Sequence, residues 1–165
     1  MFVNKYENIF DIKFNWRTVS LLCFLAVFPN VLGAFHTTVL GVRVHFFQYL
    51  VFLAAILYGP AGGVISGAFG SVYTAIALHN PYIIVGNVLL GGLTGLFIKR
   101  YNFHVISAVL TAYLIQMPWL WVTDIYLAGM PMKAVNSIVV ALLISDLLWG
   151  SVAWFTGRRI RAIVS

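Results

Sequence analysis

The feature that most constrains this chain is a long uncharged stretch, residues 46–97, which contains no Asp, Glu, Lys or Arg. Two short breaks interrupt the stretch, Tyr58-Gly59-Pro60 and His79-Asn80-Pro81-Tyr82. They leave three apolar segments of about 16 residues each, close to the shortest helix that crosses the roughly 30 Å hydrocarbon core of a bilayer. The stretch therefore predicts three short transmembrane helices that are joined by tight turns.

Small residues recur every four positions within this stretch, which places them on one face of each predicted helix. The first series is Gly59, Gly63, Gly67 and Ser71, and the second is Asn87, Gly91 and Gly95. Because a stripe of small residues lets two helix backbones approach closely in lipid, we expect these helices to be tightly packed.

Composition extends this interpretation to the whole chain. Apolar residues make up 62% of the sequence and charged residues only 8%, whereas soluble domains carry about 25% charged residues. The fold class is therefore predicted to be an all-α membrane protein without a separate soluble domain. The formal charge is +6, but the basic residues lie between apolar spans or near the termini, so nucleic acid is not an expected partner. The single cysteine, Cys23, cannot form an intrachain disulfide.

Six membrane-spanning helices are predicted, and they form one compact bundle over residues 18–156. An N-terminal cytoplasmic or interfacial segment, 1–17, precedes the bundle, and a basic cytoplasmic tail, 157–165, follows it. The predicted helices cover residues 18–35, 44–57, 61–77, 82–98, 103–126 and 134–155.

The distribution of basic residues predicts the orientation of the bundle. With six spans, eight basic residues fall on the side of both termini, and only Arg43 and Lys133 fall on the other side. Because Lys and Arg are enriched in cytoplasmic loops, both termini are expected to be cytoplasmic. The segments 36–43, 79–82 and 127–133 are then expected to face outward.

Polar and aromatic residues gather in the outward layer that this topology defines. Aromatic faces, amides and one carboxylate in a single layer suit a small, flat, polar ligand. Two other interpretations remain open, because an interfacial aromatic belt and amides that bond neighbouring helices give the same pattern. The residues of the predicted layer are His79, Asn80, Tyr82, Asn87, Trp119, Trp121, Asp124, Tyr126 and Asn136.

Asp146 is the acid placed nearest the middle of a predicted span. A carboxylate at that depth is costly, so it marks either a functional site or a hydrogen-bonding residue that pins the last helix. The histidines His36, His45 and His79 do not have metal-ligand spacing, and no nucleophile, paired-acid or phosphate-loop motif occurs. We therefore expect no enzymatic activity, no metal and no cofactor.

Three consecutive segments resemble a known family. FFQYLVFLAAILYGP, AGGVISGAFGSVYTAI and PYIIVGNVLLGGLTGLF are similar to the substrate-binding S component of energy-coupling factor (ECF) transporters. In particular, residues 57–63 are similar to the LxGPxxG turn that ends helix two in that family. The resemblance implies a six-helix chain with cytoplasmic termini in a prokaryotic cell membrane.

The resemblance also implies a function and partners. Such a subunit captures a vitamin or another small heterocyclic micronutrient from outside the cell. It delivers the ligand through a membrane T component that two ATPase subunits power. The family's helix one often carries an AxxxA motif for T-component contact, and here Ala26 and Asn30 stand at that spacing. The residues expected to dock the partner are Ala26, Asn30, Gly63 and Gly67. The residues expected to bind the substrate are His79, Asn80, Tyr82, Asn87, Trp119, Trp121, Asp124 and Asn136.

Two other functions are compatible with the sequence. The first is a membrane scaffold that resembles the rod-shape protein MreD and needs no ligand. The second is a small ion- or proton-coupled secondary transporter that uses Asp146.

Overall fold

The computed structural model describes residues 12, 15–39 and 42–164, with side chains except at 36–39, 42–44 and 161–164. Apart from one short β-hairpin, all of its regular elements are helices, as the fold-class prediction required. Five helical segments are long and apolar enough to cross a membrane, which fits a membrane-embedded protein. The elements are α1 Trp16–Gly33, β1 His36–Val39, β2 Val42–His45, α2 Phe47–Gly70, α3 Val72–Ala77, α4 Tyr82–Tyr101, α5 Val105–Val122, the π-helical turn η1 Thr123–Leu127, and α6 Met132–Val164.

The chain reverses inside α2. The backbone of Gly59 leaves helical geometry with φ 68° and ψ −150°, a left-handed conformation that glycine adopts without steric cost. Val51 and Gly63 both lie against Gly91 of α4, although they would be about 18 Å apart in a straight helix. The residues 47–58 and 60–70 are therefore two antiparallel halves, as the Gly-Pro turn predicted.

The predicted count of six spans is not confirmed. The five segments counted above include residues 47–77 as one segment. By itself the first half of α2 is only about 18 Å long, which is too short to cross the hydrocarbon core alone. Nearly all side chains of this half are nonetheless buried against the other helices, and they form much of the protein core.

The glycine series make the closest contact between two helices. A Cβ at Gly63 would collide with the backbone carbonyl of Gly91, and a Cβ at Gly67 would collide with that of Asn87. The second half of α2 therefore packs backbone to backbone against α4, as the four-residue spacing predicted. Gly63 and Gly67, which the sequence suggested for partner docking, are buried in this internal contact.

The other two residues suggested for docking also serve internal contacts. Ala26 is buried. The Asn30 side chain donates a hydrogen bond to the Phe69 carbonyl oxygen (2.7 Å) and accepts one from the Tyr73 backbone N–H (2.8 Å). Phe69 is the second-last residue of α2, before the bend at Ser71, and Tyr73 is the second residue of α3. Asn30 therefore satisfies backbone groups that the bend between α2 and α3 leaves free.

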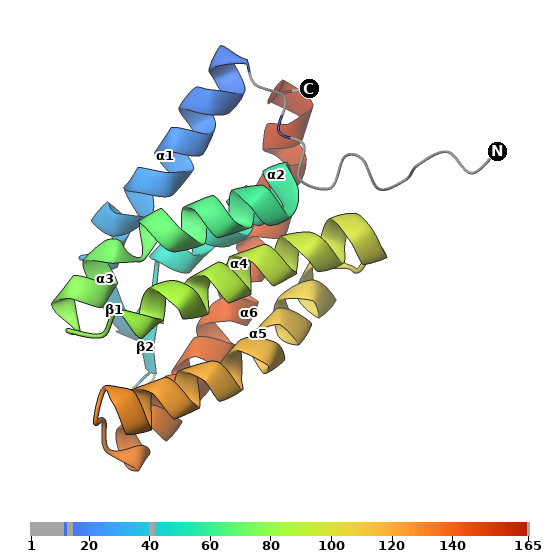
Figure 1. Cartoon of the computed structure of the whole chain (residues 1–165). Coiled ribbons are helices and arrows are strands. Elements are labelled where there is room, and N and C mark those ends of the chain that lie inside the picture. The colour runs from blue at the N-terminus through green and yellow to red at the C-terminus, as the bar shows by residue number, and fades with distance from the viewer. Residues whose placement is uncertain (1–11, 13–14, 40–41, 165) are drawn as a thin grey trace.

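β1 and β2 form a hairpin instead of the outward loop predicted for residues 36–43 and the helix start predicted at residue 44. β1 and β2 pair antiparallel, with His36 opposite His45 and Val39 opposite Val42. β-branched residues fill much of both strands, which favours extended backbone. The hairpin lies at the end of the bundle where α3 meets α4 (Figure 1).

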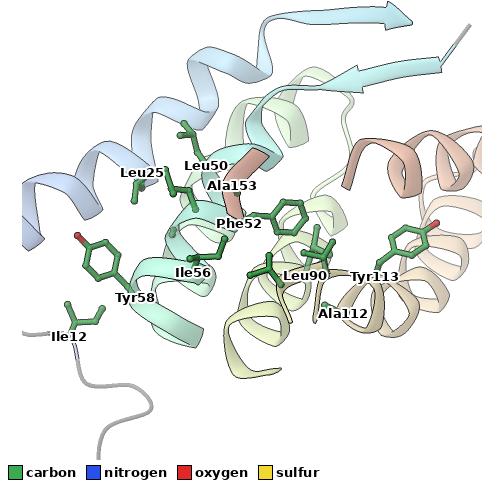
Figure 2. Packing of buried hydrophobic residues seen from close by; sticks show 14 residues of the cluster. Ile12, Leu25, Leu50, Phe52, Ile56, Tyr58, Leu90, Ala112, Tyr113 and Ala153 are labelled. Carbon is green, nitrogen blue, oxygen red and sulfur yellow. The ribbon is translucent and has the colours of Figure 1, made fainter. Parts of the chain in front are cut away.

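The helices are arranged so that α1 begins, and α6 ends, on the same side of the bundle (Figure 1). This arrangement agrees with termini on one side, although it does not identify that side as cytoplasmic. α6 continues to Val164 and so includes nearly all of the stretch predicted as a basic tail. Buried apolar residues from α1, α2, α4, α5 and α6 meet at the centre, among them Leu25, Phe52, Leu90 and Ala153 (Figure 2).

Candidate ligand-binding site

A cavity opens among the helices at the end of the bundle that carries the hairpin. The volume open to the centre of a water-sized sphere is about 180 Å³, more than ten times the roughly 15 Å³ that one water molecule needs. Its wall is mainly apolar, with polar groups set into it, which is the usual character of a small-molecule site. The lining residues are His45, Phe47, Gln48, Thr74, Leu78, Asn80, Tyr82, Ile83, Gly86, Asn87, Gln116, Trp119, Leu120, Thr123, Asp124, Ala128, Met130, Ile138 and Leu142.

Five of the eight residues that the sequence suggested for substrate binding line this cavity. They are Asn80, Tyr82, Asn87, Trp119 and Asp124. They come from the α3–α4 turn, the start of α4, the end of α5 and η1. The tertiary structure thus brings together a set of residues that the sequence could assign only to one layer of the membrane.

The polar centre of the wall is a hydrogen bond between two buried side chains. The Asn80 amide nitrogen donates to an Asp124 carboxylate oxygen at 2.6 Å, and the two residues are only 2% and 5% exposed. The Asn80 side-chain oxygen accepts a hydrogen bond from the Tyr82 backbone N–H (3.1 Å). Asn80 therefore links the first turn of α4 to the carboxylate on η1.

A π-helical turn places Asp124 in the wall. η1 continues α5 with one extra residue per turn, and the Ala128 N–H donates to the Thr123 carbonyl oxygen at 2.8 Å. The Met130 N–H donates to the Asp124 carbonyl oxygen, also at 2.8 Å, and so folds the following segment back over the cavity. Single π-turns within helices are uncommon and often occur at functional sites.

Trp119 is fixed against the opposite helix. Its indole N–H donates to the Tyr82 carbonyl oxygen at 3.2 Å, so the ring is held between α5 and α4. With its only donor used, the ring offers a ligand its aromatic surface instead of a hydrogen bond.

The wall also contains polar residues that were not predicted from the sequence, and Gln48, Gln116 and Thr74 are among them. The Gln48 side-chain oxygen accepts a hydrogen bond from the Ser145 hydroxyl at 2.6 Å. Gln116 is 4% exposed and its Oε1 has no partner, and the buried Thr74 hydroxyl has none either, among the described residues. Gln48 and Gln116 each stand in an apolar run, and this polar interruption is the one signal that could have identified them.

The other three predicted substrate residues lie outside the cavity. His79 is exposed in the turn before α4, where its φ is 52°. The Trp121 indole N–H donates to the Asn136 side-chain oxygen at 3.2 Å, and this pair joins the end of α5 to α6. Trp121 also meets Tyr126 edge to face, with ring centroids 6.4 Å apart. These contacts agree with the two other interpretations of the polar layer, an aromatic belt at the membrane interface and an amide that bonds neighbouring helices.

Asp146 lies one helical turn from Leu142, a residue of the cavity wall on α6. Its side chain is 1% exposed, and neither carboxylate oxygen has a hydrogen-bond partner among the described residues. It is therefore a buried acid beside the cavity instead of a part of the wall.

The chemistry of the wall suits reversible binding. Amides, a carboxylate, an imidazole and aromatic faces converge on a partly closed space. Within the described part of the chain, no three His, Cys, Asp or Glu side chains are grouped as metal ligands.

Comparisons with protein-family models, curated proteins and solved structures found no match for this chain.

Proposed function

We propose that this protein is a membrane-embedded binding subunit for a small micronutrient, of the kind found as the S component of ECF-type importers. It captures a vitamin-like or heterocyclic molecule from outside the cell and passes it to a T component that two ATPase subunits power. The sequence resemblance over residues 46–97 and the cavity at one end of the bundle support this proposal.

The observation that carries the proposal is the presence of incompletely satisfied polar groups in the cavity wall. Buried polar side chains normally have hydrogen-bond partners, yet Gln116 Oε1 and the Thr74 hydroxyl have none within the described structure. A scaffold has no need for such a cavity, because polar groups without partners lower its stability. A binding protein retains them because reorientation of these side chains lets a ligand complete the hydrogen bonds.

The test is ligand capture by the purified protein. After extraction in mild detergent, bound small molecules are released by denaturation and identified by mass spectrometry. We expect one compound at close to one equivalent, and we expect Asp124→Ala and Trp119→Ala to lose most of it. Trp121→Ala is the matched control, because it also removes a tryptophan from the end of α5 but from outside the cavity.

Failure of this test has a clear meaning. If the wild type carries no compound, and a panel of vitamins, nucleobases and amino acids fails to raise its melting temperature, the MreD-like scaffold becomes the better explanation. The partner proposal has a separate test, which is co-purification with a T component and its two ATPases after co-expression.

A second candidate function rests on Asp146. A fully buried carboxyl group without partners among the described residues is characteristic of ion and proton pathways in membrane proteins. On this alternative, proteoliposomes would show cation or proton flux that Asp146→Asn abolishes. Ligand capture without such flux would exclude it.

A further inference from the structure

We propose that the cavity selects ligands by charge: it takes a neutral or cationic molecule with N–H donors, places those donors at Asp124, and rejects carboxylates and phosphates. This inference rests on the proposed function, because it names the chemical class of the molecule that the same cavity would hold.

The first argument is the charge balance of the wall. Asp124 is 5% exposed, and Asn80 is its one side-chain partner in the described structure. No Lys or Arg occurs among the lining residues whose side chains are described, and the basic side chain of the wall is the imidazole of His45, so no permanently positive side chain of the described wall faces Asp124. Burying a carboxylate without a positive partner costs several kcal/mol. A ligand with a positive group, or with two N–H donors, would offset that cost, whereas an anionic ligand would add to it.

The second argument is that the start of α4 offers no free anion site. The N-terminus of a helix often binds anions through N–H groups that have no partner. Here the N–H groups of Tyr82 and Ile83 are bonded to the Asn80 side chain (3.1 Å) and backbone carbonyl (3.4 Å). The next N–H, that of Ile84, is bonded to the Pro81 carbonyl oxygen (3.2 Å).

The third argument concerns the body of the ligand. The cavity that Asp124 lines is also lined by Leu120, Ile138, Leu142 and Trp119. Apolar side chains and an aromatic face favour a flat ring system over a sugar or a flexible chain. The expected ligand is therefore a small aromatic heterocycle that carries an amino, amidine or similar N–H-bearing group.

Charged thiol reagents test the electrostatic preference whatever the natural ligand is. In a Cys23→Ser background, Ala128→Cys places a thiol in the cavity wall, and Met132→Cys places one outside the cavity at the same end of the bundle. Each thiol is treated with a cationic reagent, the trimethylammonioethyl methanethiosulfonate, and with an anionic one, the sulfonatoethyl methanethiosulfonate. The quantity measured is the cationic-to-anionic rate ratio at position 128 divided by the ratio at position 132.

We expect this normalised ratio to be about 10 or more, since a carboxylate in the wall of a partly dehydrated cavity attracts the cationic reagent and repels the anionic one. Asp124→Asn should return it to about 1, because the amide keeps the shape of the side chain and removes its charge. If position 128 does not react, Met130→Cys in the same wall replaces it.

Two outcomes would overturn the proposal. One is a normalised ratio at or below 1 in the parent protein. An anionic preference that disappears in Arg43→Gln would identify Arg43, whose side chain is not among those described, as the charge that controls the cavity. The other is a cationic preference that survives Asp124→Asn, because Asp124 would then not be its cause.

Three pyridines of similar size test the preference with ligands. 3-(Aminomethyl)pyridine is cationic near neutral pH, nicotinamide is neutral and nicotinate is anionic. At concentrations of about 10 mM, sufficient to detect millimolar binding, the cation should raise the melting temperature most and the anion least, and Asp124→Asn should abolish the difference.

The two experiments separate this inference from the function on which it rests. If nicotinate, or a co-purified acid, stabilises the protein as well as the cation does, the charge selection is wrong although small-molecule capture stands. If no compound binds at all, the proposed function fails, while the reagent ratio still decides whether Asp124 gives the cavity a negative potential.

Discussion

The Asn80 amide nitrogen lies 2.6 Å from an Asp124 carboxylate oxygen, across 44 residues of sequence, and both side chains are buried. This contact joins the turn before α4 to the π-helical turn after α5. It therefore closes one wall of the cavity and holds the single described carboxylate of that wall in place.

Removing Asn80 should destabilise the protein through Asp124. Asn80→Ala leaves the buried carboxylate without its donor, which costs about 1.5–3 kcal/mol for a hydrogen bond to a charged group. The double variant Asn80→Ala/Asp124→Ala should lose less than the sum of the two single losses, because the two groups interact directly. Unfolding in mixed micelles measures each value, and the exposed Asn136→Ala is the control, with an expected loss below about 1 kcal/mol. Additive losses would contradict the contact.

The backbone contact between α2 and α4 should not tolerate a single methyl group. Gly63→Ala introduces a Cβ into the Gly91 carbonyl, and we expect a loss of about 1–3 kcal/mol from overpacking. Gly150→Ala is a matched control, because the nearest atom to its new Cβ is a Val109 methyl group at 3.1 Å, which can shift. The control should be neutral or gain up to about 1 kcal/mol from helix propensity. Equal effects of the two substitutions would show that this packing is wrong.

Asn30 should act as a structural residue at the bend between α2 and α3. Asn30→Leu removes hydrogen bonds to the Phe69 carbonyl oxygen and from the Tyr73 N–H, at a cost of about 1–3 kcal/mol. Ser137→Ala serves as the control, since the Ser137 hydroxyl bonds only a carbonyl oxygen of its own helix. A stable Asn30→Leu variant that no longer bound a T component would instead support the docking role that the sequence suggested.

Asp146 should be replaceable by a neutral isostere without loss of stability. Because neither of its oxygens has a described partner, Asp146→Asn should leave the free energy of unfolding unchanged or raise it, since an uncharged amide costs less to bury than an ionised carboxylate. Ser145→Ala, which breaks the bond to Gln48, should instead cost about 1 kcal/mol. A marked loss in Asp146→Asn would indicate a bound cation or another partner, and would strengthen the ion-coupled alternative.

The orientation of the bundle is testable with two exposed positions at opposite ends. In a Cys23→Ser background, Met132→Cys should react with a membrane-impermeant maleimide applied to intact cells. Tyr101→Cys should react only after the membrane is opened. Both side chains are more than half exposed, so differences in burial should not obscure the result. The reverse pattern would place the termini outside.

Much of the fold could be predicted because it depends on local patterns. Low charge and long apolar runs require helices, since a backbone in lipid must satisfy its own hydrogen bonds. Gly59-Pro60 predicted a reversal, and the four-residue glycine spacing predicted a close helix pair. The β-hairpin was not predicted, because residues 36–43 are too few and too mixed in polarity to show a clear strand pattern and were assigned to an outward loop. The π-turn η1 was missed because one extra residue in a helix leaves no clear trace in composition.

The candidate site was predictable only in part. The predicted topology placed Asn80, Tyr82 and Asp124 at one depth in the membrane. Depth alone does not tell whether a side chain faces the interior of the bundle or the lipid. The helix rotations that turn Trp119 inward, and pair Trp121 with Asn136, follow from packing against neighbours.

The sequence by itself determined a membrane-embedded helical chain, the reversal at Gly59 and the stripe of small residues, because each depends on the chemistry of nearby positions. Only the tertiary structure decided that Gly63 and Gly67 contact α4, and that the Asn30 side chain bonds backbone groups at the bend between α2 and α3. It also decided that Asn80 and Asp124 meet in a cavity wall. These pairings join residues that are far apart in the chain, so they depend on how whole helices rotate and pack against one another.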